Sequence, residues 1–177
     1  MGNYWLRKTK RYKRHFLCFQ CRKNFKKPNE KDLAEANGEL SILLNAFYYS
    51  KPKKKVSKEL VQYLKEKYFN TKEKCPECAL EMVEVPMSYE TPTKKNINEW
   101  RNLKIFYNAE GFVKQHLPVK KKEFIEYLEE TLSWHIKMVQ NVENHRSRKE
   151  SVGDARTRIR QNIETIRGEL AVLKKEK

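Results

Sequence analysis

The sequence lacks a long apolar segment, and its first 27 positions contain no acidic residue. No hydrophobic run approaches the roughly 18 residues that a transmembrane helix needs, so we expect no membrane span. Gly and Pro together number only 11, which argues against a low-complexity chain. A phosphate-binding Gly-rich loop, a G-x-S-x-G motif and an H-E-x-x-H motif are all missing. We therefore expect neither an enzyme nor a small-molecule substrate.

Apolar residues are scarce as well. Hydrophobic residues make up 38% and charged residues 35% of the 177 positions, so the core is small for this length. The length suits one domain, or a small domain with an appendage. The first residues, "MGNYWLRKTK", contain no apolar segment of the secretory type, and Leu6 stands where myristoylation needs Ser or Thr. We expect a cytoplasmic chain whose thiols stay reduced.

The positive charge is concentrated at the N-terminal end. The formal net charge is +16, to which residues 1 to 27 contribute +10, residues 28 to 122 contribute +5 and residues 123 to 177 contribute +1. Such a concentration favours a polyanionic partner, most often a nucleic acid. The interleaved aromatic residues can stack on unpaired bases, which favours irregular RNA over duplex DNA. We predict phosphate contacts from the following residues: Arg7, Lys8, Lys10, Arg11, Lys13, Arg14, Arg22, Lys23, Lys26, Lys27, Lys53, Lys54 and Lys55.

Two other interpretations of the basic segment stay open. It could be a solvated tail, with Phe16, Phe19 and Phe25 serving a small core rather than nucleic-acid bases. It could also lie on an anionic membrane surface, although it lacks the amphipathic period that such a helix needs.

All four cysteines occur in two Cys-x-x-Cys pairs, Cys18 with Cys21 and Cys75 with Cys78. Each pair can turn two thiolates towards one point, and two pairs complete the closed tetrahedral site of structural zinc. The 53 residues between Cys21 and Cys75 exceed the spacing of a compact ribbon, so we interpret residues 29 to 74 as a helical insertion. We predict one structural zinc ion. A redox dithiol, an iron–sulfur cluster and unliganded thiols are the alternatives.

The periodicity predicts an α+β fold. Alternating apolar residues predict a strand, a turn and a returning strand around the first cysteine pair, and another strand from Leu80 to Val85. Helices are predicted over residues 29 to 49, over residues 58 to 69 after the cap Ser57, and over residues 97 to 109, where Asn96 and Glu99 form a capping box. The predicted parts are a basic extended arm (1–14), a zinc-ribbon domain with its insertion (15–112) and C-terminal helices (121–177).

The C-terminal helices carry two apolar seams at heptad spacing. The seams consist of Ile125, Leu128, Leu132, His135, Val139 and Val142, and of Ile159, Ile163, Ile166, Leu170 and Leu173. Gly153 and Asp154 lie between the seams and suit a turn. The simplest prediction is an antiparallel helical hairpin, because each narrow seam is unstable alone. One long bent helix lying on a partner is the alternative.

The stretch "CPECALEMVEVPMSYETPTKKNINEWRNLKIFYNAEGF", from Cys75 to Phe112, resembles a pattern in small basic bacterial proteins with two Cys-x-x-Cys pairs. There a proline-containing connector leads to a Trp-bearing helix and a Gly-Phe pair, and the family is associated with the ribosome. The resemblance covers residues 12 to 28 and 75 to 112. Arg22 and Ala79 stand where zinc knuckles often carry Gly. The resemblance implies a structural role for this chain, in contact with ribosomal RNA and neighbouring ribosomal proteins.

These observations lead to three hypotheses. The first is a zinc-ribbon ribosomal or ribosome-associated protein that binds ribosomal RNA through its arm and ribbon. The alternative is a zinc-dependent adaptor of another nucleoprotein machine, such as a transcription or phage factor, that binds a protein through residues 121 to 177. The third is a nucleic-acid-processing enzyme that uses the ribbon as a clamp, which requires carboxylates beside the basic face.

Overall fold

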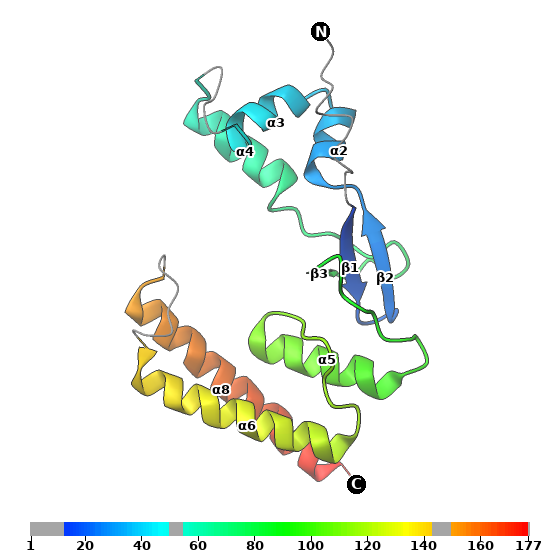
Figure 1. The fold of residues 1–177 in the computed structure, drawn as a ribbon, viewed down its shortest axis with the longest axis vertical. Coiled ribbons are helices and arrows are strands. Elements are labelled where there is room, and N and C mark those ends of the chain that lie inside the picture. The colour runs from blue at the N-terminus through cyan, green and yellow to red at the C-terminus, as the bar shows by residue number, and fades with distance from the viewer. Residues whose placement is uncertain (1–12, 50–54, 143–149, 177) are drawn as a thin grey trace. The chain divides into compact units, whose positions relative to one another are not determined.

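The structure is a computed structural model that describes residues 13–49, 55–142 and 150–176. The described residues form one three-stranded antiparallel sheet and six helices (Figure 1), which confirms the predicted α+β class. The chain divides into two compact units, Met1–Thr91 and Pro92–Lys177. Within the described ranges, no helix combines the length and the apolar character that a bilayer crossing needs. Six predicted phosphate contacts lie outside the described residues: Arg7, Lys8, Lys10, Arg11, Lys53 and Lys54.

The sheet of the first unit has the strand order β2-β1-β3. The central strand β1 (Arg14–Cys18) pairs with β2 (Lys23–Lys27) on one edge and with β3 (Val83–Val85) on the other. Figure 1 shows β1 and β2 side by side. The strand, turn and returning strand predicted around the first cysteine pair are therefore confirmed.

The predicted strand from Leu80 to Val85 is wrong in its first half. Leu80 is exposed, and the pairing with β1 begins only at Val83. The preceding residues close a separate turn instead, through an isolated bridge between Lys74 and Glu81. This turn is the one that carries the second cysteine pair.

Three helices make up the insertion: α2 (Glu30–Ala36), α3 (Leu40–Phe47) and α4 (Lys58–Tyr68). The single helix predicted over residues 29 to 49 is wrong, because Gly38 adopts a left-handed φ of 71° and divides it into α2 and α3. The cap of α4 is confirmed, since the Ser57 hydroxyl accepts a hydrogen bond from the Leu60 amide at 3.2 Å. The helices share a core of Ala34, Leu43, Leu64 and Tyr68.

The second unit contains α5 (Ile97–Glu110), α6 (Lys121–Gln140) and α8 (Val152–Lys175). The N-cap of α5 is confirmed, because the Asn96 side chain accepts from the Glu99 amide at 3.4 Å. The second bond of a capping box is replaced, since the Glu99 carboxylate accepts from the Asn96 side-chain amide at 2.6 Å while the Asn96 backbone amide donates to Thr93. The helix ends at Gly111 with a left-handed φ of 76°. Its buried face packs on α8 in this unit, whereas the sequence suggested that it belongs to the ribbon domain.

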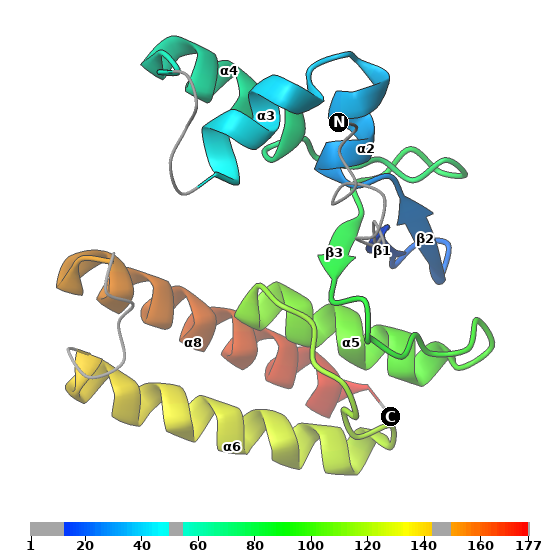
Figure 2. The same ribbon diagram turned by 45° about the horizontal axis from the view of Figure 1, so that its top comes forward.

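Helices α6 and α8 lie side by side and antiparallel (Figure 2), which excludes the alternative of one long bent helix. The turn predicted at Gly153 and Asp154 is wrong. Both residues lie in the first turn of α8, where the Ser151 hydroxyl accepts from the Asp154 amide at 3.1 Å and caps the helix. The glycine needs no special conformation there, because a helix start only requires an N-cap with a short polar side chain.

The two predicted seams differ in accuracy. Every residue of the α8 seam, from Ile159 to Leu173, is buried. In the α6 seam, Ile125, Leu132 and Val139 are only half-buried, and Phe124 and Met138 are buried in place of Ile125 and Val139. The buried residues Phe124, Leu128, His135, Met138 and Val142 still follow heptad spacing, so the seam keeps its period and is displaced by one position on one of its two sides.

Candidate metal centre

The four cysteines lie together beside the turn that joins β1 and β2. Their Sγ atoms all lie within 4.8 Å of one another. The Sγ atom of Cys18 is 3.5 Å from that of Cys78, and the Sγ atom of Cys75 is 3.7 Å from that of Cys21. All four thiols are free of disulfides. Each of these short distances joins the two pairs, so each pair supplies half of one site.

This arrangement fits a single metal ion. Zn–S bonds of about 2.3 Å in a tetrahedron separate the sulfurs by about 3.8 Å, close to the two shortest distances here. A cluster of several iron and sulfide ions is larger than one ion and holds its cysteine sulfurs further apart. Four sulfurs fill a tetrahedral coordination sphere and leave no position for a substrate. The four cysteines can therefore hold one ion with four protein ligands, as closed zinc sites do.

The two turns that carry the cysteines share a backbone conformation. The residue after each pair is left-handed, with φ of 53° at Arg22 and 59° at Ala79. Within the first turn the Cys21 amide donates to Cys18 Sγ at 3.4 Å, and within the second the Glu77 amide donates to Cys75 Sγ at 3.4 Å. Residues other than Gly adopt this conformation at a cost of about 1 kcal/mol. The turn usually made with Gly thus forms here without it.

The backbone favours one of the four thiols as a thiolate. Burial by itself raises the pKa of Cys75, but the amides of Glu77 and Cys78 donate to its sulfur and bring the pKa down to about 7. At Cys18 and Cys21 burial is the largest influence and raises the pKa of both thiols. A bound cation would favour the thiolate form of the whole set, because metal ligands bind deprotonated.

No family model, curated protein or solved structure matches this chain. The resemblance to ribosome-associated zinc ribbons therefore stays a prediction, and the role of the site rests on its geometry.

Two ion pairs connect the halves of the site. Lys23 Nζ lies 2.5 Å from Glu77 Oε1, which joins β2 to the second turn. Lys27 Nζ lies 3.6 Å from Glu73 Oε2, and these residues precede and follow the helices of the insertion. The two ends of the insertion are thus held close together, as the shared metal site requires. Sequence reasoning missed both acids, although their positions two residues on either side of Cys75 were a usable indication.

The aromatic residues near the first pair support the site from inside. Phe16 is buried and forms one cluster with Cys18, Cys75 and Met82, against which Phe25 packs. The Arg14 guanidinium lies 5.0 Å from the centroid of the Phe16 ring. Phe16 and Phe25 therefore belong to the core around the thiols, which favours the interpretation that they serve the ribbon and not nucleic-acid bases.

The described basic candidates fall into two groups. Arg14 makes a bidentate pair with Glu84, with N–O distances of 2.8 and 2.5 Å, while Lys23 and Lys27 make the ion pairs given above. Within residues 13–49, 55–142 and 150–176, no ion pair involves the other four candidates: Lys13, Arg22, Lys26 and Lys55. The positive charge of these four residues is therefore not neutralised by an ion pair within the described part of the chain.

Proposed function

We propose that the chain is a zinc-ribbon ribosomal or ribosome-associated protein that holds one structural zinc ion and binds ribosomal RNA. The observation that carries the proposal is the closed site of four sulfurs at a turn bearing uncompensated cations. In this role Cys18, Cys21, Cys75 and Cys78 hold the ion, and the ion makes the turn rigid. A rigid turn presents Arg22 and Lys26 to phosphates with little loss of conformational freedom on binding.

The charge of the first unit supports a polyanionic partner. Residues 1 to 91 contain 20 Lys or Arg and 11 Asp or Glu, a net charge of +9. Three of the described candidates are neutralised by internal acids, so RNA contact falls to Lys13, Arg22, Lys26 and Lys55 together with the cations of the arm. Neutralising phosphates releases counterions, which makes such binding strong at low salt and weak at high salt.

Sedimentation of the endogenous protein tests the proposal. It should travel with ribosomal subunits at physiological salt and leave them at high salt. A quantitative version replaces Arg7, Lys8, Lys10 and Arg11 by Gln, which should weaken the binding of the purified protein to ribosomal RNA by about tenfold or more. The matched control replaces Lys94, Lys95, Lys104 and Arg156 by Gln, which removes the same charge from the second unit. Equal losses in the two variants, or sedimentation free of ribosomes at low salt, would contradict the proposal.

One observation favours the adaptor as a second candidate. Helices α6 and α8 bury their seams against each other, so contact with a protein partner falls to their outer faces. On that side Trp134 is 51% exposed, which is unusual for so large an apolar residue. An affinity purification dominated by polymerase subunits, without ribosomal proteins, would favour this candidate over the first.

A further inference from the structure

The apolar stripe of α6 extends beyond the part that is buried. On one side of the buried seam, Ile125, Leu132 and Val139 are half-buried and Ile136 is 41% exposed. At about 100° per residue, the stripe from Met138 to Ile136 spans about 160° of the helix, whereas about 100° is typical of a helix that faces one core. The half-exposed part, which we call the second stripe, consists of Ile125, Leu132, Ile136 and Val139. It offers a surface to a further apolar partner.

Helix α5 lies on the other side of the α6–α8 hairpin. The ring centroids of Phe106 on α5 and Tyr127 on α6 are 6.0 Å apart. Tyr127 is two positions from Ile125 in the sequence, which places the two side chains about 200° apart around α6. The second stripe therefore faces away from α5, and within the second unit only α8 borders it.

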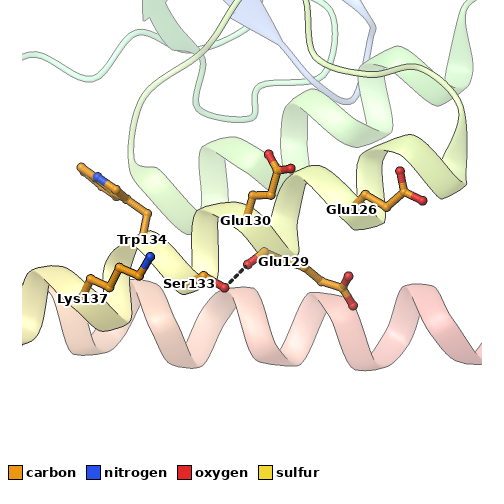
Figure 3. Close-up of a pocket in the computed structure, with 6 residues that line it drawn as sticks. All are labelled: Glu126, Glu129, Glu130, Ser133, Trp134 and Lys137. Atoms are coloured by element: carbon orange, nitrogen blue, oxygen red, sulfur yellow. Dashed lines mark hydrogen bonds between the residues drawn. The ribbon is translucent and has the colours of Figure 1, made fainter.

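An ion pair shows which edge of α8 borders the second stripe. Lys174 Nζ lies 2.6 Å from Glu129 Oε1, and Glu129 is one helical turn after Ile125. Figure 3 shows Glu129 and Glu130 leaving α6 on different sides, with Glu129 on the side nearer to α8. The edge of α8 that contains Lys174 thus lies beside the second stripe.

This edge of α8 is cationic. Residues at intervals of four and seven positions recur along it, namely Arg156, Arg160, Arg167 and Lys174. Lys174 is paired as described, and Arg167 lies 3.3 Å from the exposed Glu164. Among the residues that the structure describes, no ion pair involves Arg156 or Arg160. Their guanidinium groups can each bind a carboxylate from outside through two parallel hydrogen bonds.

An apolar stripe beside a cationic edge indicates the chemistry of the partner. A nucleic acid would neutralise the arginines but leave the second stripe in contact with water. A second copy of the chain would bring further cations, because residues 92 to 177 contain 19 Lys or Arg and 12 Asp or Glu, a net charge of +7. An amphipathic helix with carboxylates along one flank complements both the stripe and the edge.

The length of the second stripe indicates the length of that helix. From Ile125 to Val139, α6 rises by about 21 Å, which equals about four helical turns. We infer that the second stripe binds an acidic amphipathic helix of a partner protein, with the carboxylates of that helix on Arg156 and Arg160. This inference goes beyond the proposed ribosomal role, which concerns the cations of the first unit.

Fluorescence anisotropy tests the inference with the full chain and a fluorescein-labelled peptide of about 18 residues. The peptide carries Leu at heptad positions a and d, Glu along one flank and Ala elsewhere. Ile136→Gln should weaken binding by about tenfold, because it removes the most exposed apolar side chain of the second stripe. Arg156→Gln/Arg160→Gln should weaken binding by about fivefold, because two ion pairs are lost.

Each variant has a control elsewhere in the second unit. Val172→Gln removes an apolar side chain of α8 that is 53% exposed and lies two positions from Lys174, on another side of the helix. Lys94→Gln/Lys95→Gln removes two positive charges, as the arginine variant does. Both controls should bind the peptide as tightly as the wild type does. Circular dichroism verifies that all variants keep their helices.

Four outcomes would overturn the inference. The first is equal affinity of the wild type and Ile136→Gln, and the second is equal binding of a peptide with the same composition in scrambled order. The third is self-association of the chain that Ile136→Gln abolishes in analytical ultracentrifugation, which would assign the surface to a second copy. The fourth is an RNA oligonucleotide that loses affinity in the arginine variant but not in the lysine variant. The ribosomal test uses variants of the arm, so failure of one proposal is distinguishable from failure of the other.

Discussion

The imidazole of His135 and the carboxylate of Glu110 form a buried pair, with Nε2 and Oε1 2.5 Å apart. The two side chains are 2% and 8% exposed. The pair joins the last turn of α5 to the middle of α6, at a place where the heptad pattern predicted only another seam residue. This polar pair links α5 to α6 within the second unit.

Replacing one member of this pair should lower the free energy of unfolding much more than replacing both members. His135→Leu leaves the Glu110 carboxylate buried without its partner, and we expect the free energy of unfolding to fall by about 3 kcal/mol. The double variant His135→Leu/Glu110→Leu should recover most of that loss, because no charge is then left unpaired. Urea unfolding of the wild type, the single variants and the double variant measures the coupling. Additive effects of the two substitutions would show that the pair is not an energetic unit.

Removing one sulfur should remove the metal. Cys75→Ser takes away the ligand whose thiolate the backbone favours, so the zinc content should fall from about one ion per chain to about zero. The sheet of the first unit should unfold more readily, by about 3 kcal/mol or more, because binding and folding of such sites are coupled. Elemental analysis gives the stoichiometry and identifies zinc or iron. Full retention of metal and stability would refute the shared site.

Removing the metal with a chelator tests the same site without a substitution, because the response of the two units can be compared in one chain. The core of the second unit contains no cysteine and is built from residues such as Ile159, Ile163 and Met138. We expect a strong chelator to shift the NMR signals of Phe16 and Leu17 towards unfolded positions while the methyl signals of Ile159 and Ile163 change little. Loss of both sets at the same chelator concentration would mean that the metal stabilises both units.

The left-handed residue after the second cysteine pair predicts that a substitution by Gly will stabilise the protein, whereas Gly usually destabilises it. Ala79→Gly relieves the strain of a φ of 59°, so it should stabilise the protein by about 0.5 kcal/mol after the greater freedom of Gly in the unfolded chain is deducted. The control is Ala171→Gly on the exposed face of α8, which should destabilise by about 0.5 to 1 kcal/mol. Thermal unfolding compares the two. If both variants destabilise equally, the strain at Ala79 is absent.

The insertion contains a carboxylate whose pKa should make its stability depend on pH. The Tyr68 hydroxyl and then the Lys67 ammonium bind the carboxylate of Glu39 and lower its pKa below the usual 4.5. A lowered pKa means that the folded state holds the proton less tightly than the unfolded state. The stabilisation is therefore complete above pH 4.5 and is lost as the pH falls through the folded pKa.

Glu39→Gln tests this dependence. The wild type should be more stable than the variant at about pH 7, and the difference should shrink by about pH 3. Acid also protonates metal-binding thiolates, so wild type and variant are compared at the same pH. Glu66→Gln is the control, since Glu66 is an exposed residue of α4 that accepts a hydrogen bond from neutral Gln62. An unchanging gap between wild type and Glu39→Gln would contradict the assigned cause.

The features that could be predicted from the sequence are those governed by local spacing. The two cysteine pairs, the caps Ser57 and Asn96 and the α8 seam were all found, because each depends on residues at fixed short intervals. The break at Gly38 was underestimated. A glycine within a helical pattern usually costs a little stability, and nothing local says when it will adopt a positive φ and end the helix.

Other features depend on packing between segments and had no local pattern. The docking of α5 on α8 follows from buried residues such as Trp100 and Phe106, whose helical spacing is the same whichever partner covers them. A hollow lined by residues of α5, α6 and the segment between them joins Phe112 to Trp134, 22 positions apart in the sequence, so it becomes visible only in the fold. The pairing of Arg14 with Glu84 likewise depends on which strand lies beside β1, and only the acids flanking Cys75 could have been suspected from their positions.

The ion pair of Lys27 with Glu73 holds the two ends of the helical insertion together, so the length of the insertion can vary without separating the two cysteine pairs. Closing a loop costs entropy that grows only with the logarithm of its size, so extending the spacing between the cysteine pairs from about 18 to 53 residues adds about 1 kcal/mol. A metal bound by four thiolates supplies roughly ten times as much. The stretch from residue 29 to residue 72 can thus be lengthened, shortened or exchanged for another module while the ribbon keeps its closure, which makes this junction a natural point for grafting new sequence.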